Sequence, residues 1–380
     1  MAADFNDFSC PAPLADQETI VMGHGGGGQL SARLIETVFL PAFGATATAT
    51  AGADTGGADT AETAPPARGG ATPDEQLLEC LGDGAVLAPL PGRLVLATDA
   101  HVVRPLEFPG GDIGELAVNG TVNDVAMMGG TPIALAVSFV LEEGLPIPLL
   151  RRIAESMGRA ARRAGVRVVT GDTKVVDRGK CDGMFITTTG LGQVPDGVRV
   201  GPDRARPGDV VIVSGPIGRH GVAVLSVREN LAFGTGITSD TAPVAGAVGA
   251  LLAAGVDAHA LRDPTRGGLA ATLNEIAAAS GVGVEIADAD VPVPAEVARA
   301  CGFLGLDPMH VANEGVFVAF VNPADAERAL RLIRAQPVGV GAAVIGVAVA
   351  EHPGKVIART PIGAHRVVTM PLAEPLPRIC

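Results

Sequence analysis

The sequence predicts an α+β fold divided into two domains. Its 380 residues exceed the usual length of one domain. Both halves mix segments patterned as strands with segments patterned as helices, which favours α+β over a doubly wound sheet. A stretch near 195–205, rich in Gly, Pro and Asp, interrupts these patterns. We therefore expect an N-terminal domain over 18–195 and a C-terminal domain over 196–370.

In the N-terminal half, apolar periodicity and capping residues predict the elements. Helices are expected after residue 28, where apolar residues recur at helical spacing, after Asp112, which with Glu115 forms a capping-box-like start, and between Pro148 and Gly165. Strands are expected at 94–98, 133–141, 166–170 and 184–191.

The C-terminal half shows the same mixture of patterns. Strands are expected at 210–214, 282–286 and 315–321, with further strands closing the domain. Helices are expected at 244–254, 268–280, 295–301 and 323–335.

Three segments lack these patterns. Residues 1–17 have the mixed polar and proline composition of a poorly ordered terminus. Residues 45–76 alternate Ala and Thr and then turn to Gly, Asp and Pro, which predicts a disordered, dispensable insertion. Three prolines precede the end of the 371–380 segment, which predicts a mobile tail that presents Cys380.

Composition limits the classes of partner. The net charge of −13 argues against nucleic acid as a partner, and the chain contains neither Trp nor Tyr to stack on bases. No apolar run is long enough to span a membrane, and the N-terminus lacks the features of a signal peptide. We therefore expect a cytoplasmic protein with no membrane partner.

The cysteine pattern indicates a reducing compartment. Five cysteines are widely spaced and none forms a CxxC pair, so neither a disulfide framework nor a thiolate zinc site is expected. Cys380 is the last residue and would remain a free thiol. Arg378 would lower its pKa and the adjacent terminal carboxylate would raise it, so activation would require a base or cation in a pocket. The alternative is an incidental terminal cysteine.

A run of four glycines precedes the first expected helix: Gly25, Gly26, Gly27 and Gly28. Backbone N–H groups free of Cβ hindrance, ahead of a helix N-terminus, can cradle a phosphate. A flexible linker would have the same composition, and the residues alone leave both readings open. His24 beside this run, and His220 beside a later glycine turn, could contact substrate, although lone histidines are more often structural.

Four aspartates follow strands, occupy a helix face or lie in glycine-flanked turns: Asp83, Asp99, Asp124 and Asp172. Carboxylates gathered in this way could hold Mg²⁺ that bridges phosphates, because Mg²⁺ prefers hard oxygen ligands. Each alone is more simply a cap or turn residue. The set of four beside a glycine loop favours a metal–nucleotide site.

Three further charged residues have two open readings each. Lys174, two positions after Asp172, could stabilise a transition state or form a surface ion pair. Glu314 could act as a general base or lie in a solvated turn. Arg266 in the Asp263-Pro264-Thr265-Arg266 start of a helix could contact phosphate, or the motif could serve only as a cap.

The motifs together resemble a known family, the carbamoyl dehydratases HypE of nickel–iron hydrogenase maturation. The resemblance covers about 18–380 apart from 45–76 and rests on segments 24–28, 98–99, 108–114, 119–124, 171–176, 263–268, 313–315 and 377–380. The nucleotide motifs are shared with aminoimidazole ribonucleotide synthetase, selenophosphate synthetase and thiamine-monophosphate kinase. The terminal Pro377-Arg378-Ile379-Cys380 is specific to HypE.

The resemblance implies a PurM-like architecture, ATP and Mg²⁺, and a homodimer formed by pairing N-terminal sheets. It implies that the carbamoyltransferase HypF loads a carbamoyl group on Cys380, which ATP-dependent dehydration converts to a thiocyanate. A HypC–HypD complex would then receive the cyano group on iron. Asn123, Asp124, Thr173 and Arg266 would join the glycine run at ATP.

Carried over by motif, Glu314 is expected to be the base and Lys174 the electrostatic stabiliser. Two other readings remain open. One is a kinase or synthetase of the same superfamily that acts on a free small molecule. The other is a carrier that binds nucleotide and presents a thiol without turnover.

Overall fold

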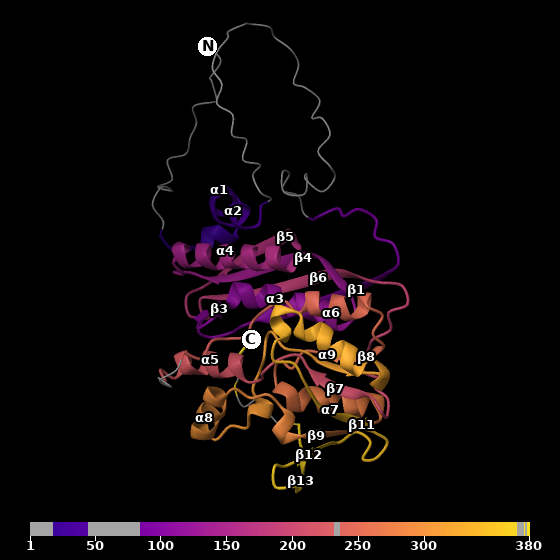
Figure 1. Cartoon of the computed structure of the whole chain (residues 1–380). Helices are drawn as coiled ribbons and strands as arrows, with labels where there is room; N and C mark the ends of the chain where they lie inside the picture. The colour runs from indigo at the N-terminus through magenta and orange to yellow at the C-terminus, as the bar shows by residue number, and fades with distance from the viewer. Residues whose placement is uncertain (1–17, 45–83, 232–235, 371–375, 377) are drawn as a thin grey trace, which may run out of the picture.

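The computed structural model describes residues 18–44, 84–231, 236–370, 376 and 378–380. The predictions made for 1–17, for 45–76 and for Asp83 lie outside these residues. Figure 1 shows the N-terminal elements stacked above the C-terminal ones, with α3 and α6 lying where the two halves meet.

The N-terminal half contains a four-stranded sheet in the order β1-β6-β4-β5. Its elements are β1 (Arg93–His101), β2 (Glu107–Phe108), β3 (Gly111–Asp112), α3 (Ile113–Met127), β4 (Thr131–Glu142), α4 (Ile147–Ala164), β5 (Arg167–Val176) and β6 (Met184–Val194). They are preceded by η2 (Met22–Gly25), α1 (Gln29–Leu34), the π-helical η3 (Ile35–Phe39) and α2 (Leu40–Phe43).

One face of this sheet is covered by helices, whereas the other, here called the open face, carries exposed side chains of β1. The covered face packs against α3 and α4 in the main apolar core. On the open face, Leu94 and Leu96 of β1 are 55% and 70% exposed. Burial alternates along β1 and β6 because successive strand side chains point to opposite faces.

The helix α3 begins as the sequence predicts. The carboxylate of Asp112 accepts hydrogen bonds from the backbone N–H groups of Gly114 and Glu115, at 2.8 and 3.0 Å. Almost every residue of α3 is buried, because the sheet lies on one side and the C-terminal half on the other. Its C-terminal residues Ala126 and Met127 belong to a core that includes α6.

The C-terminal half contains a seven-stranded sheet in the order β13-β12-β9-β11-β7-β10-β8. Its strands are β7 (Val210–Val213), β8 (Ala258–Arg262), β9 (Gly283–Ala287), β10 (Val318–Val321), β11 (Ala343–Val349), β12 (Val356–Arg359) and β13 (His365–Val368). Its helices are α5 (Arg219–Arg228), α6 (Ala245–Ala253), α7 (Gly268–Ser280), α8 (Ala295–Leu304) and α9 (Ala326–Arg334). Short helical turns are η4 (Asp288–Asp290), η5 (Pro308–His310), η6 (Pro323–Asp325) and η7 (Pro337–Gly339).

The mixed sheets and helices confirm the predicted α+β class, but several local predictions were wrong. The strand expected at 94–98 continues to His101. The strand expected at 166–170 continues to Val176, because β5 stays paired in parallel with β4 through Gly171 and Asp172. The strand expected at 315–321 begins at Val318. The helix α5 and the strand β8 were not anticipated.

Candidate active site

Carboxylates from both halves of the chain gather between the N-terminal sheet and the C-terminal half. This carboxylate cluster consists of Asp99, Asp124, Asp240, Asp263 and Glu314. Burial raises the pKa of Asp124 to about 7, with further contributions from the charges of Asp263 and Asp99. Burial likewise raises the pKa of Asp263 and of Asp240 to about 6. Carboxylates held this close disfavour full ionisation.

Glu314 lies deepest in the cluster. Its side chain is only 3% exposed, and its Oε1 has no hydrogen-bond partner. Burial, followed by repulsion from Asp263 and Asp240, raises the pKa of Glu314 well above its ordinary value. This environment favours the neutral acid form of Glu314, and its carboxylate would be a stronger base than usual once ionised.

Asp99 has a different environment at the edge of the cluster. Burial pushes its pKa upward, but a hydrogen bond and the charge of His101 outweigh that effect, so the pKa of Asp99 lies below its ordinary value. His101 Nε2 is 3.3 Å from Asp99 Oδ2, and the positive charge of Arg266 acts on the same carboxylate. The structure thus brings Asp99, Asp124, Glu314 and Arg266 together, as the sequence suggested.

The cluster suits a cation bound together with phosphate. Across 18–44, 84–231 and the later described residues, no three His, Cys, Asp or Glu side chains are already arranged to hold a metal ion. Mg²⁺ at nucleotide sites commonly takes only one or two protein carboxylates, with phosphates and water completing its shell. The repelling pair Asp99 and Asp124, and the unpartnered oxygens of Asp240 and Glu314, fit that role.

The glycine run forms an ordered turn against β5. A side chain at Gly25 would place its Cβ only 2.4 Å from the backbone nitrogen of Val175. Gly27 and Gly28 have φ values of 79° and 83°, which side chains rarely tolerate. Ser31 Oγ accepts from the Gly27 N–H at 3.0 Å and donates to the His24 carbonyl at 2.8 Å. A flexible linker does not describe this segment.

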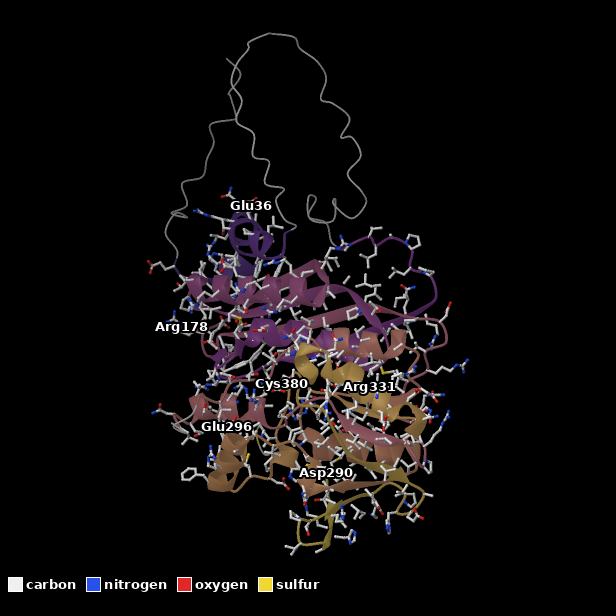
Figure 2. All side chains as sticks on the ribbon, in the orientation of Figure 1. Glu36, Arg178, Asp290, Glu296, Arg331 and Cys380 are labelled. Carbon is white, nitrogen blue, oxygen red and sulfur yellow. The ribbon has the colours of Figure 1, made fainter. Side chains whose placement is uncertain are left out.

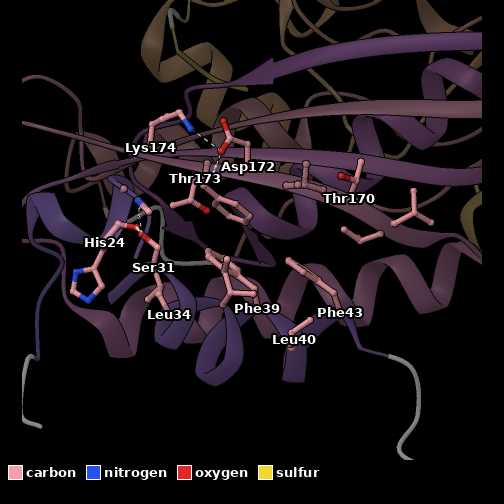
Figure 3. Close-up of a pocket in the computed structure, with 18 of the residues that line it drawn as sticks. His24, Ser31, Leu34, Phe39, Leu40, Phe43, Thr170, Asp172, Thr173 and Lys174 are labelled. Atoms are coloured by element: carbon pink, nitrogen blue, oxygen red, sulfur yellow. Dashed lines mark hydrogen bonds and ion pairs between the residues drawn. The ribbon is translucent and has the colours of Figure 1, made fainter. Parts of the chain in front are cut away.

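Beside this turn lies a cavity of about 330 Å³, the glycine-loop pocket, shown in Figure 3. Its apolar wall includes Phe39, Phe43 and Phe139, with the rings of Phe39 and Phe139 4.8 Å apart. Asp172, Thr173 and Lys174 line its polar side. An apolar wall beside a polar turn and a lysine is the pattern of a small-molecule site.

Asp172 does not join the other predicted metal ligands. Lys174 Nζ donates to Asp172 Oδ1 at 2.7 Å, and this hydrogen bond leads the effects that hold the pKa of Asp172 below its ordinary value. In the sheet register Asp172 lies in one row with Ser138, Thr187 and Ala100. That row is three strand spacings long, or ~14 Å. Asp99, the neighbour of Ala100, points to the opposite face.

Asn123 occupies a structural position in this chain. Its Nδ2 donates to the carbonyls of Ala242 and Glu314, at 3.1 and 3.3 Å, and its Oδ1 accepts from the Val244 N–H at 2.8 Å. These bonds join α3 to the C-terminal half, so the amide positions Glu314. Both Nδ2 donors are engaged inside the protein, which differs from the predicted nucleotide contact.

The end of the tail is docked between the two halves, where Figure 2 labels Cys380. The Val102 N–H donates to the Cys380 backbone oxygen at 3.1 Å, and Arg378 forms an ion pair with Asp182. Ile379 is 1% exposed. The mobile tail predicted from the prolines is therefore held at its end in this structure, while 371–375 and 377 lie outside the described residues.

Two described residues at this site were missed by the sequence reasoning. Asp240 has no recognisable motif around it. His101 adjoins the Thr98-Asp99 motif, and the strand pattern could have shown that it shares a face with Asp99. Both have a buried atom without a partner, His101 Nδ1 and Asp240 Oδ1.

Comparisons with known proteins agree with this two-part architecture. The family model described as AIR synthase related protein, N-terminal domain matches residues 81–194, and the corresponding C-terminal domain matches 206–359. Of the helices in the described parts of the chain, none is both long and apolar enough to cross a membrane. The fold and these matches therefore define a protein of the AIR synthase related class.

Closer similarities identify the family within that class. Carbamoyl dehydratase HypE of Rhizobium leguminosarum bv. viciae is 49% identical over 95% of each chain. A crystal structure of HypE in complex with ATP matches with 44% identity and a TM-score of 0.84, covering 95% of this chain and 99% of that one. HypE in a HypE–HypF complex matches with 45% identity and a TM-score of 0.72, covering 78% and 96%. This chain belongs to the HypE carbamoyl dehydratase family.

Proposed function

We propose that this chain uses ATP to dehydrate an S-carbamoyl group on its own Cys380 to a thiocyanate during nickel–iron hydrogenase maturation. The observation that carries the proposal is the docked tail. Val102, which binds the terminal residue, directly follows His101, whose ring lies 3.3 Å from Asp99 of the carboxylate cluster. A group carried on the Cys380 sulfur would be brought close to that cluster.

The chemistry requires both activation and proton removal. The carbamoyl oxygen is a poor leaving group until it receives the γ-phosphoryl group of ATP, after which it departs with phosphate. The nitrogen loses both of its protons as the C≡N bond forms. Glu314 is the proposed base, since its raised pKa makes its carboxylate unusually basic once it is ionised. Mg²⁺ at Asp99 and Asp124 would supply positive charge to the phosphoryl oxygens.

We assign ATP to the glycine-loop pocket, with its phosphates toward the carboxylate cluster of a dimer. Gly25–Gly28 and Thr173 would bind the nucleotide, Arg266 would contact phosphate, and Lys174 would stabilise developing negative charge. In one subunit the pocket adjoins β5, at one edge of the sheet, and Asp99 lies in β1, at the other edge. Because one subunit separates these two parts of the site, we propose a homodimer in which the pocket of one subunit meets Asp99 of the other. The subunits would join through the open sheet face, where Leu94 and Leu96 are exposed.

The partners follow from the same assignment. A HypF-type carbamoyltransferase would load Cys380, as the solved HypE–HypF complex of a similar protein suggests. A HypC–HypD-type iron complex would accept the cyano group. Cys181, Cys301 and Cys380 are not in disulfides, which is consistent with a reducing cytoplasm.

The test follows the mass of the intact chain. Purified protein is incubated with carbamoyl phosphate, ATP, Mg²⁺ and a carbamoyltransferase, and we expect a carbamoyl adduct that then loses one water to become a cyano adduct. Cys380→Ala should abolish both, with Cys181→Ala as the matched control. ATP turnover that ignores Cys380→Ala would support a small-molecule kinase or synthetase instead. A carbamoyl adduct that never dehydrates would support a carrier.

A further inference from the structure

The last residues of the chain bind the body of the protein through backbone oxygens. The N–H of Val102 donates to the oxygen of Cys380 at 3.1 Å, and the N–H of Arg104 donates to the carbonyl of Arg378 at 3.4 Å. These positions run in opposite directions along the two segments, as in an antiparallel pair of strands. The tail thus extends the backbone pairing just beyond the end of β1.

The carbonyl of the residue between them, Ile379, points the other way and meets His220 on α5. Its oxygen lies 2.8 Å from His220 Nε2. The other ring nitrogen, Nδ1, lies 2.8 Å from Ser239 Oγ, and Ser239 Oγ accepts from the Thr241 N–H at 3.1 Å. His220 is fully buried, and Phe108 packs edge-on to its ring with centroids 5.4 Å apart.

The Ile379 carbonyl fixes the tautomer of His220. A carbonyl can only accept, so Nε2 must carry the proton. Burial lowers the pKa of His220 to about 4, which keeps the ring neutral and leaves Nδ1 as an acceptor for the Ser239 hydroxyl. The direction of every hydrogen bond is then fixed: Thr241 donates to Ser239, Ser239 donates to His220, and His220 donates to the Ile379 carbonyl.

We infer that His220, oriented by Ser239, is a positioning residue that holds the tail in the docked state required for dehydration. The inference rests on the proposed function, because docking matters for turnover only if Cys380 carries the substrate. His220 does not touch the reacting group. It binds the carbonyl of Ile379, the residue before Cys380. This bond adds to those that Val102 and Arg104 make with the tail backbone.

The inference predicts a specific order among variants. His220→Gln retains an N–H near the position of Nε2, whereas His220→Ala leaves the Ile379 carbonyl without this donor. Loss of a buried hydrogen bond of this kind corresponds to about a tenfold change in an equilibrium. We expect His220→Ala to slow conversion of carbamoyl to cyano adduct by about tenfold with an unchanged KM for ATP, and His220→Gln to restore most of the rate. Carbamoylation should not slow, because it requires the tail to be released.

Hydrogen exchange tests the docking without any turnover. The amides of Val102 and Arg104 should exchange about tenfold faster in His220→Ala than in the wild type, and removal of residues 376–380 sets the upper limit. His310→Ala is the matched control, since His310 also bonds a backbone carbonyl, that of Thr369, 3.1 Å away. It should change neither readout.

Two results would overturn the inference. The first is that the amides of Val102 and Arg104 exchange at the wild-type rate in His220→Ala, although removal of residues 376–380 makes them exchange faster. The other is a His220→Gln variant as defective as His220→Ala, which would mean that ring packing alone matters. A wild-type chain that never forms the cyano adduct would refute the proposed function and leave the exchange result standing.

Discussion

Replacement of Asp124 by Asn should stabilise the protein at alkaline pH while abolishing dehydration. Burial, together with the charges of Asp263 and Asp99, raises the pKa of Asp124 to about 7 from an ordinary value of 3.8. Because the folded-state pKa lies above the unfolded one, stability is full below pH ~4 and falls as pH rises toward 7. Asparagine cannot ionise, so Asp124→Asn avoids this loss.

The size of the effect follows from the pKa. A difference of one pKa unit corresponds to about 1.4 kcal/mol. Between pH 5 and pH 7 the ionisation of Asp124 therefore lowers the folding stability by about 3 kcal/mol. Because Asp263 shares the repulsion, we expect the stability advantage of Asp124→Asn to grow by about 2–3 kcal/mol between pH 5 and pH 8. Chemical denaturation without Mg²⁺ at the two pH values measures it.

The control is Asp172→Asn on β5. Its pKa is lowered chiefly by the hydrogen bond from Lys174, and its side chain is exposed, so the substitution should have a small effect that does not favour the variant as pH rises. An Asp124→Asn advantage that is the same at pH 5 and pH 8 would show that the carboxylates are not coupled as described.

Three further outcomes are expected. Glu314→Gln should leave the carbamoyl adduct on Cys380 intact and reduce its conversion to the cyano adduct at least ~100-fold, measured by intact mass, since general bases typically contribute that much; ready conversion would remove Glu314 as the base. Leu96→Asp should shift the protein to monomers in sedimentation experiments, because a charge on the open sheet face opposes pairing, and an unchanged dimer would place the interface elsewhere. Deletion of residues 45–76 should leave ATP turnover unchanged, and lost turnover with the fold intact would contradict the expected neutrality of this low-complexity segment.

Much of the fold could be predicted because local signals agreed with the tertiary structure. Asp112 caps α3 as its spacing with Glu115 suggests, and α7 spans the predicted residues. Asp99 and Asp124 come together because one lies on β1 and the other on the helix packed against it. A strand followed by a helix on the same sheet face keeps such a pair close.

The rest could not be predicted because it depends on contacts between distant segments. Gly171 indicates a turn in the sequence, yet β4 pairs with that residue and carries β5 onward, which takes Asp172 away from Asp99. Asn123 belongs to a nucleotide motif by resemblance, but its amide binds carbonyls about 120 and 190 positions later in the chain. No local pattern indicates which distant carbonyls a buried amide will meet.

The resting ionisation of the cluster explains how the tail can dock without reacting. Burial and the surrounding carboxylates raise the pKa of Glu314 well above its ordinary value, which favours the form that cannot remove protons from a carbamoyl nitrogen. Positive charge arriving beside Asp99 and Asp124 would weaken the repulsion that keeps the proton on Glu314. Its base function would then appear only when nucleotide and cation are bound, which would couple proton removal to phosphoryl transfer. Docking by His220 and activation of the base would then be separate steps of the reaction.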